Sequence, residues 1–368
     1  MKKNLNKIDY KKEMIKYAQF NLNETSDSFS KIKWDQFSNF GWFGLNVSDH
    51  YGGLNQPHSV CANVIMELGY YCNDNGFTFT IVNHWWMVIY LIELFGNKTI
   101  KEKYLNDLIT GKKIGAFALT EPDAGSDSKS IKTYVKEDNG FILNGNKSFV
   151  TNGSIADVFI VFAKYNSEIK CFVVEKNTKG LVVSKKIEKM GLDSNPTCDI
   201  YFENCLIPKD NMLGNNYDGY QIMLSALSIE RFYEFVPIVG IMKRIMQKCI
   251  NYSQERKQFG KSISSNQAIS FKISNMAMVI ELAEQYIKKI SNKLDNNENI
   301  FFEASVFKLF VSENYVKLCK DAIQIFGGYG YSKEYGLERE LRDSIASTIY
   351  SGTSEIQRQT IFDLISIL

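Results

Sequence analysis

The sequence contains few of the residues that bind metals or stiffen linkers. Among its 368 residues are only 5 prolines and 3 histidines, and none of the 7 cysteines forms a Cys-x-x-Cys pair. Because His50, His58 and His84 lie far from any pair of cysteines, we expect no metal site. An odd number of scattered cysteines in a chain this long argues against a disulfide framework and favours a reducing compartment.

The sequence also lacks an excess of charge of either sign and a long hydrophobic run. Its 43 basic and 41 acidic side chains leave a formal net charge of +2, which argues against a nucleic-acid partner. No apolar run follows the charged first residues, so we expect no secretory signal. The longest apolar stretch, residues 85–95, contains Glu93 and is too short to span a bilayer. These features predict a soluble, cytoplasmic protein without membrane insertion.

Arginine is scarce and occurs only at positions 231, 244, 256, 339, 342 and 358, while lysine supplies the other positive charges. The guanidinium group has a planar fork of donors that suits phosphates and carboxylates. Its confinement to the C-terminal part indicates a specific anion-binding or ion-pairing role there. For Arg244 we expect an ordinary solvated position instead.

Hydrophobic periodicity divides the chain into three domains, which we place at residues 1–114, 115–213 and 214–368. The first and third have apolar residues at the three-to-four spacing of helices, and the middle one has short strands with tight turns. The predicted fold is mainly α with a central β domain: an N-terminal helical domain, a middle β-sandwich or barrel, and a C-terminal four-helix bundle. Alternating βαβ units and a Gly-x-Gly-x-x-Gly motif after a strand are absent, which disfavours a Rossmann nicotinamide enzyme.

Glycine and proline make three local predictions. Asn144-Gly145 predicts a hairpin turn, because both residues accept the positive φ angles of a type I′ turn. Pro237 predicts a kink in a long helix over 220–254, since it removes a backbone donor. Gly327-Gly328 predicts the end of a helix over 301–326.

Two segments of the middle domain have residues suited to a cofactor. Residues 118–127 combine small residues and hydroxyls in turns that could hold a phosphate or a polar ring, or simply connect two domains. In residues 148–153, Phe149 and Thr151 are two apart and therefore on one face of a regular strand. That pair suits stacking and hydrogen bonding to a flat ligand, although such a pattern is also common in a core.

Two segments of the C-terminal domain allow the same pair of interpretations. Residues 255–261 gather three basic side chains around a glycine turn, as at a pyrophosphate site or a solvated helix end. In residues 349–358, Thr353 is placed to cap the last helix, and capping alone would explain it.

The order and spacing of these segments resemble the acyl-CoA dehydrogenase family of flavoproteins from about residue 30 to the end. The matching stretches are 119–127, 149–153, 255–260, 324–328 and 342–358. The resemblance implies that FAD lies between the middle and C-terminal domains, and that each FAD site borrows residues from a neighbouring subunit of a dimer or tetramer. It implies cofactor-binding roles for Phe117, Leu119, Thr120, Gly125, Ser126, Phe149, Thr151, Arg256, Phe259, Gln267, Gln324, Gly327, Gly328, Thr353 and Glu355.

The resemblance also implies the reaction, α,β-dehydrogenation of an acyl thioester, in which a carboxylate removes the α-proton and the β-hydride passes to flavin. Many members have the catalytic glutamate where this chain has Ser351. A minority, the isovaleryl-type and long-chain-type enzymes, have it directly before an arginine on the first long helix of the C-terminal domain. Glu230 and Arg231 occupy that place, so we assign Glu230 as the base, with Glu234 one turn on as a weaker rival. The implied substrate-binding residues are Ser126, Arg231, Tyr350, Ser351 and Gly352.

Three functions stay open on the sequence alone. The first is a dehydrogenase of acyl-CoA, and the second is a dehydrogenase of an acyl or aminoacyl group tethered to a carrier protein in a biosynthetic pathway. The third is a catalytically silent FAD-binding paralogue, which Ser351 favours and Glu230 opposes. The acyl chain, the oligomer size and the electron acceptor, an electron-transfer flavoprotein or oxygen, do not follow from the sequence.

Overall fold

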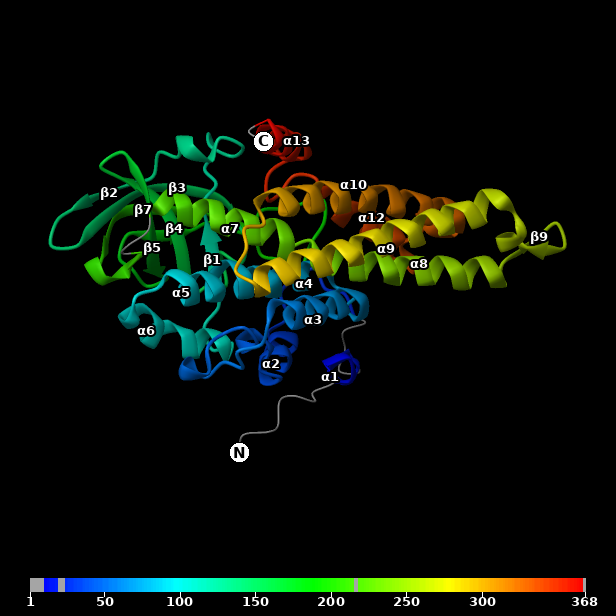
Figure 1. The fold of residues 1–368 in the computed structure, drawn as a ribbon, viewed down its shortest axis with the longest axis horizontal. Helices are drawn as coiled ribbons and strands as arrows, with labels where there is room; N and C mark the ends of the chain where they lie inside the picture. The colour runs from blue at the N-terminus through cyan, green and yellow to red at the C-terminus, as the bar shows by residue number, and fades with distance from the viewer. Residues whose placement is uncertain (1–9, 19–23, 215–217, 367–368) are drawn as a thin grey trace.

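The computed structural model describes residues 10–18, 24–214 and 218–366, and confirms the predicted order of helices, strands and helices (Figure 1). The domain boundaries at residues 114 and 213 stay predictions. The N-terminal helices are α1 (Tyr10–Ala18), α2 (Lys31–Asn39), α3 (His58–Tyr71), α4 (Asn75–His84), α5 (Tyr90–Phe95) and α6 (Lys98–Ile109).

Helix α4, a π-helical turn (Trp85–Ile89) and α5 form one continuous helical stretch. Over 21 residues this stretch is long and apolar enough, by length and composition, to cross a membrane. However, 78% of its most apolar window is buried inside the protein, as in the core helix of a globular domain.

The middle region forms one sheet in the order β6-β7-β3-β2-β4-β5-β8, with β1 pairing in parallel with β4. Strand β4 shows why this region folds against the helices. Val158, Ile160 and Phe162 belong to the core shared with the helices, and the alternate residues Phe159 and Val161 belong to the core inside the sheet. Because both faces of β4 are buried, its sequence is a continuous hydrophobic run. The strands are β1 (Gly115–Ala118), β2 (Tyr134–Glu137), β3 (Phe141–Val150), β4 (Val158–Tyr165), β5 (Glu168–Glu175), β6 (Leu181–Val183), β7 (Cys198–Ile207) and β8 (Met212–Leu213).

The hairpin predicted at Asn144-Gly145 is wrong, because β3 runs unbroken through both residues. Gly145 lies at a register shift between β3 and β7, and a Cβ there would lie 2.5 Å from Oγ1 of Thr133. The glycine therefore serves a bulge and a close approach rather than a turn. The tight turn lies between β2 and β3, where Asn139 has a φ of 48°.

The C-terminal region is helical, but the single helix predicted over 220–254 is two helices, α7 and α8. Two turn residues, Glu234 and Phe235, separate them. Pro237 lies in the first turn of α8 and kinks nothing, because a proline there gives up no helical hydrogen bond. Helix α10 ends at the predicted glycine, Gly327, which has a φ of 60°. The elements are α7 (Gly219–Tyr233), α8 (Val236–Glu255), β9 (Lys257–Gln258), β10 (Lys261–Ser262), α9 (Gln267–Asp295), α10 (Phe301–Phe326), α11 (Gly328–Tyr331), α12 (Leu337–Ser347) and α13 (Ser354–Ile365).

Two glycines allow α3 and α8 to touch along their backbones. A Cβ at Gly69 would lie 2.0 Å from the carbonyl oxygen of Pro237, and one at Gly240 would lie 2.0 Å from that of Met66. Any side chain at either position would push the helices apart. This contact fixes the C-terminal bundle to the N-terminal helices immediately after the break between α7 and α8.

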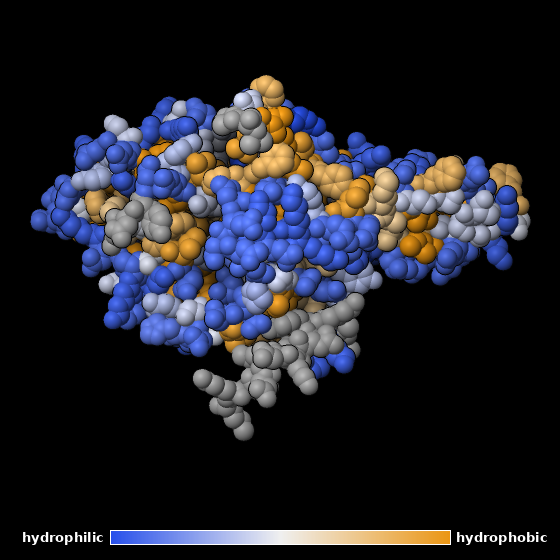
Figure 2. Space-filling view, viewed as in Figure 1, coloured by the Kyte–Doolittle hydropathy of each residue, from blue (hydrophilic) through white to orange (hydrophobic). Residues whose placement is uncertain are grey.

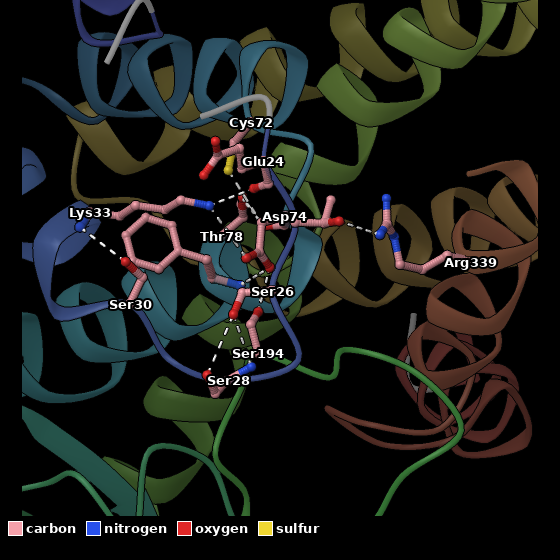
Figure 3. Close-up of polar contacts among 12 residues, drawn as sticks. Glu24, Ser26, Ser28, Ser30, Lys33, Cys72, Asp74, Thr78, Ser194 and Arg339 are labelled. Carbon is pink, nitrogen blue, oxygen red and sulfur yellow. Dashed lines mark hydrogen bonds and ion pairs between the residues drawn. The ribbon is translucent and has the colours of Figure 1, made fainter. Parts of the chain in front are cut away.

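A buried polar cluster around Asp74 fixes the start of α4 (Figure 3). The Asp74 carboxylate caps the helix by accepting from the backbone N–H of Phe77 at 3.0 Å, and it also accepts from the hydroxyl of Ser194. The ammonium of Lys33 lies 3.8 Å from the other carboxylate oxygen. Three separate segments therefore meet at the N-terminus of α4, which sets the position of the helix beside the site described below.

Arg244 is buried, so the expectation of a solvated position for it is wrong. Its side chain is 8% exposed, and its NH2 nitrogen donates to Glu340 at 2.9 Å and to Asn75 at 3.0 Å. A buried carboxylate and an amide oxygen replace the water that this guanidinium loses on folding. Arg244 thus joins α8 to α12 and to the start of α4.

Candidate active site

Glu230 lies near the C-terminal end of α7, whose start is capped by Asp218. The helix buries Ile222, Ala226 and Ile229 and leaves Glu230 partly exposed. Arg231 does not pair with Glu230. Instead, the guanidinium of Arg231 donates to the carbonyl oxygen of Ser351 and to the hydroxyl of Ser305, both at 3.3 Å. Glu230 is therefore not the structural ion-pair partner of its neighbour.

The loop between α12 and α13 comes to the same place. Ser351 has a φ of 57°, and its carbonyl oxygen accepts from Arg231 and, at 3.0 Å, from Nε2 of Gln357. The ring of Tyr350 packs against Phe79 of α4, with ring centroids 4.8 Å apart. The structure thus brings together predicted residues from two segments that are about 120 positions apart in sequence. They are Glu230 and Arg231 in the first segment and Tyr350, Ser351 and Gly352 in the second.

The surroundings of Glu230 suit a proton acceptor. Burial raises the pKa of Glu230 to about 7, against the opposing effects of the nearby Ser351 hydroxyl and of the cations Arg231 and Lys308. In the described part of the chain, the Ser351 hydroxyl has no hydrogen-bond partner of ordinary geometry. A carboxyl group with a pKa near neutrality is both ionised often enough and basic enough to remove a weakly acidic proton.

Lys308 is a neighbour of the site that the sequence reasoning missed. It lies on α10, is fully buried, and its ammonium has no hydrogen-bond partner among the described residues. Burial lowers the pKa of Lys308 to about 8, and Arg231 acts in the same direction. A lone lysine on the apolar face made by Ala304, Phe307 and Val311 was the available signal.

Tyr350 borders a small cavity. It measures about 20 Å³, and Glu234 is among the residues that line it. The Glu234 side chain, one turn from Glu230, is 1% exposed and accepts from Nδ2 of Asn83 at 3.4 Å. Burial and the neighbouring Glu230 raise the pKa of Glu234 well above its usual value. Glu234 is thus a buried acid next to the site, whereas Glu230 is partly exposed.

The predicted cofactor residues of the middle region lie at the end of β1 and in the turn that follows. Phe117 and Thr120 are half-buried and Leu119 is buried, whereas Gly125 and Ser126 are exposed. A Cβ on Gly125 would meet nothing within 4 Å, so the backbone there is open to a ligand.

A buried ion pair holds this turn. The ammonium of Lys147 donates to Glu121 at 2.8 Å and to the carbonyl oxygen of Leu119 at 2.9 Å. Glu121 also accepts from the backbone N–H of Thr133 at 3.0 Å. Burial lowers the pKa of Lys147 to about 8, and Glu121 acts against that shift. The pair ties β3 to the turn and so fixes the backbone that would face a cofactor.

Phe149 and Thr151 do not share a strand face as predicted. Strand β3 ends at Val150, and Phe149 has a φ of 54°, so the two-residue alternation does not apply. A positive φ at a bulky residue costs about 1–3 kcal/mol. That conformation leaves the Phe149 ring 64% exposed, available for contact with a flat ligand.

The remaining predicted cofactor residues form a second group around the hairpin of β9 and β10. A pocket of about 700 Å³ is lined by Arg256, Phe259, Gly327 and Gly328. The Phe259 side chain is 98% exposed, and a Cβ at either glycine would meet nothing within 4 Å. The exposed residues Gln267 and Gln324 lie on the neighbouring helices and are not among its lining residues.

The two groups do not meet within one chain. Figure 1 shows the β9 hairpin at the end of the arm formed by α8, α9 and α10, on the side away from the sheet. Thr353 caps α13, as predicted, and the exposed Glu355 follows it in the first turn. The donor set fits FAD, because it offers exposed aromatic rings, open glycine backbone and a guanidinium suited to a pyrophosphate.

Comparison with known proteins agrees with this geometry. Three family models match the chain: the N-terminal domain of acyl-CoA dehydrogenase at residues 10–112, the middle domain at 116–205 and the C-terminal domain at 217–365. The chain is 37% identical to an acyl-CoA dehydrogenase of Bacillus subtilis over 357 residues, which cover 95% of this chain and 93% of the relative.

Two solved structures are similar throughout. The prolyl acyl carrier protein oxidase AnaB has a TM-score of 0.94 and 38% sequence identity, and 99% of each chain is covered. PigA, in a structure with FAD and proline, has a TM-score of 0.92 and 30% identity over 99% of this chain and 100% of that chain.

Proposed function

This chain belongs to the acyl-CoA dehydrogenase family, and from that premise we propose that Glu230 is the base of an FAD-dependent α,β-dehydrogenation of an acyl thioester. The protein is an oxidoreductase that acts on CH–CH bonds, with FAD as its cofactor. One observation carries the assignment of the base. The carboxyl group of Glu230 lies where α7 meets the 350–353 loop, is partly exposed, and has a pKa raised to about 7.

Glu230 and the residues around it have separate roles in the proposed reaction. Glu230 takes the proton from the α-carbon of the thioester. The backbone N–H of Ser351 polarises the thioester carbonyl, as a donor does in an oxyanion hole. Arg231 holds the carbonyl oxygen of Ser351 and so fixes the position of that N–H. Tyr350 and Phe79 form an apolar wall that excludes water from the acyl group.

The two groups of cofactor residues would hold FAD from two subunits. The turn after β1 and Phe149 of one subunit would face the flavin ring, and Arg256 of a neighbouring subunit would pair with the pyrophosphate. When bound, FAD supplies the acceptor for the hydride that leaves the β-carbon. Exposed apolar residues on the arm, among them Phe271, Met278 and Leu282 of α9, support a homo-oligomer, because such a surface is costly to leave in water (Figure 2).

An anaerobic titration tests the proposal. The purified yellow protein is mixed with acyl-CoAs and then with acyl or aminoacyl carrier proteins, and the flavin absorbance is followed. Loss of the yellow colour with one class of thioester shows whether CoA or a carrier protein carries the acyl group. If no thioester bleaches the flavin, the catalytically silent alternative replaces this proposal.

A carrier-tethered aminoacyl group is the second candidate substrate. Two acids, Glu234 and Asp343, line the cavity that Tyr350 borders, which suits a cationic group on the substrate. The similarity to AnaB, a prolyl carrier protein oxidase, supports the same choice. Acyl-CoA remains the first candidate substrate, and the titration distinguishes acyl-CoA from the carrier-tethered group.

The electron acceptor and the compartment also belong to the proposal. We propose an electron-transfer flavoprotein as the partner that accepts the electrons, with oxygen as the alternative acceptor. All seven cysteines are buried and free, which suits the reducing cytoplasm.

A further inference from the structure

We propose that Glu234 and Asn83 bind the protonated amine of an aminoacyl substrate, a secondary ammonium of the prolyl type, while Glu230 acts on the adjacent α-carbon. This inference rests on the proposed function and adds the residues that select the substrate.

Two buried oxygen atoms without hydrogen-bond partners carry the inference. Oε2 of Glu234 and Oδ1 of Asn83 have no hydrogen-bond partner in the described part of the chain, although the two side chains bond to each other through their other atoms. Glu234 is 1% exposed and Asn83 is 3% exposed. Buried acceptors are ordinarily satisfied, because an unsatisfied one forfeits its hydration without compensation. A secondary ammonium has two N–H donors, one for each acceptor.

The charges around Glu234 favour a cation. The charged group that raises the pKa of Glu234, in addition to burial, is another carboxyl group, Glu230. Asp343 also lines the cavity, and no lysine or arginine does. The rings of Phe79 and Tyr350 border the same space, and aromatic faces attract cations as well as apolar carbon.

Glu230 of α7 and Glu234, the residue that caps the C-terminal end of this helix, are spaced to suit two adjacent atoms of one substrate. Residues four apart lie on one face of a helix, about 6 Å apart along its axis. A carboxylate at Glu230 can therefore face the α-hydrogen while Glu234 reaches the nitrogen bonded to the same α-carbon. The backbone N–H of Glu234 donates to the carbonyl of Glu230 at 3.0 Å, which fixes this relation.

The inference predicts a release of protons on ligand binding, which can be measured without turnover. Without a cation nearby, Glu234 holds its proton, since burial and Glu230 disfavour its charge. Binding of an ammonium ionises the carboxyl group, and the displaced proton passes to solvent. Each molecule of ammonium ligand bound should therefore release up to one proton, whereas an uncharged ligand of the same shape should release none.

The experiment compares prolyl-pantetheine with cyclopentanecarbonyl-pantetheine, which has the same ring size and no amine. Both are bound to the FAD holoenzyme carrying Glu230→Gln, so that no turnover occurs, by calorimetry in two buffers of different ionisation enthalpy. We expect at least tenfold tighter binding of the prolyl thioester with proton release, and loss of both on adding Glu234→Gln. Glu281→Gln, an exposed change on α9 away from the cavity, is the control, and the preference should persist in it.

The outcomes separate the inference from the proposed function. If the wild-type enzyme bleaches equally with both thioesters, the inference is wrong and the dehydrogenase stands. If Glu234→Gln weakens both ligands equally, Glu234 is structural and the inference is again wrong. If neither thioester nor any acyl-CoA bleaches the flavin, the proposed function fails. Melting temperature and flavin content of each variant show whether the variant folds.

Discussion

Arg231 reaches across 120 residues of sequence to hold the carbonyl oxygen of Ser351, with its Nε 3.3 Å from that oxygen. The contact joins the helix that carries the proposed base to the loop that we propose faces the thioester. It turns two local motifs into one site, and it explains why an arginine follows Glu230 without pairing with it.

Replacement of this arginine tests the contact. Arg231→Lys keeps the charge but loses the planar fork, so the loop loses its fixed position. We expect kcat/KM to fall by about 10- to 100-fold, the equivalent of one hydrogen bond from a charged group, with FAD retained. Arg358→Lys is the control, because Arg358 forms an exposed pair with Glu313 that contributes about 1 kcal/mol or less. Equal activity of both variants would contradict the role of Arg231.

Glu230→Gln should remove turnover and leave the flavin bound. The amide cannot accept the α-proton, and we expect kcat to fall by about 10²- to 10⁴-fold. Rapid-mixing absorbance at the flavin band measures the reductive step directly. Glu281→Gln, an exposed change on α9, should leave the rate unchanged. Full turnover by Glu230→Gln would place the base elsewhere.

The rate of proton removal should depend on pH with a midpoint near 7. Burial raises the pKa of Glu230 to about 7, and only its ionised form accepts a proton, so kcat/KM should rise with pH and level off above that value. The rate at pH 8 should exceed the rate at pH 6 by about tenfold. A midpoint near the ordinary value for glutamate would mean that the site is wetter than the structure indicates.

Arg256→Ala should weaken FAD binding without unfolding the chain. The Arg256 side chain is exposed and is not part of the core, so its removal should leave the circular dichroism spectrum unchanged. Loss of a charged hydrogen bond to pyrophosphate corresponds to about 10- to 100-fold weaker binding. Fluorescence titration of the apoprotein with FAD measures it, and Lys176→Ala, an exposed change directly after β5, is the control. Unchanged affinity would rule out a contribution of Arg256 to the cofactor site.

His84 should make folding stability depend on pH. Nδ1 of His84 accepts from the backbone N–H of Gly115 at 2.9 Å and Nε2 donates to the carbonyl of Leu108 at 3.1 Å, so the buried ring is neutral. Burial lowers its pKa to about 3, from 6.5 in the unfolded chain. The unfolded state therefore binds the proton first, and stability is lost as pH falls below 6.5. The loss at pH 5 should be about 2 kcal/mol.

Urea unfolding of the wild type and of His84→Gln measures this loss. The glutamine offers one acceptor and one donor but does not titrate, so the difference in unfolding free energy between the two proteins should change with pH. A constant difference between pH 7 and pH 5 would show that the ring is protonated in the folded protein or is more open than the structure indicates.

The sequence by itself determined what depends on neighbouring residues. The spacing of apolar residues predicted α10 over 301–326, and Thr353 predicted the cap of α13. The assignment of Glu230, directly before Arg231, as the base also came from two adjacent residues and a resemblance, and it stays a prediction.

Only the tertiary structure decided which distant groups meet and how dry they are. Gly145 marks a bulge and not a turn because Thr133 packs against it. Lys308 and the pair of Glu234 and Asn83 lie beside the site because separate helices bring them there. Periodicity and capping are local and can be read along the chain. Burial, unsatisfied hydrogen bonds and shifted pKa values arise from the faces that pack together, and no single segment of sequence contains that information.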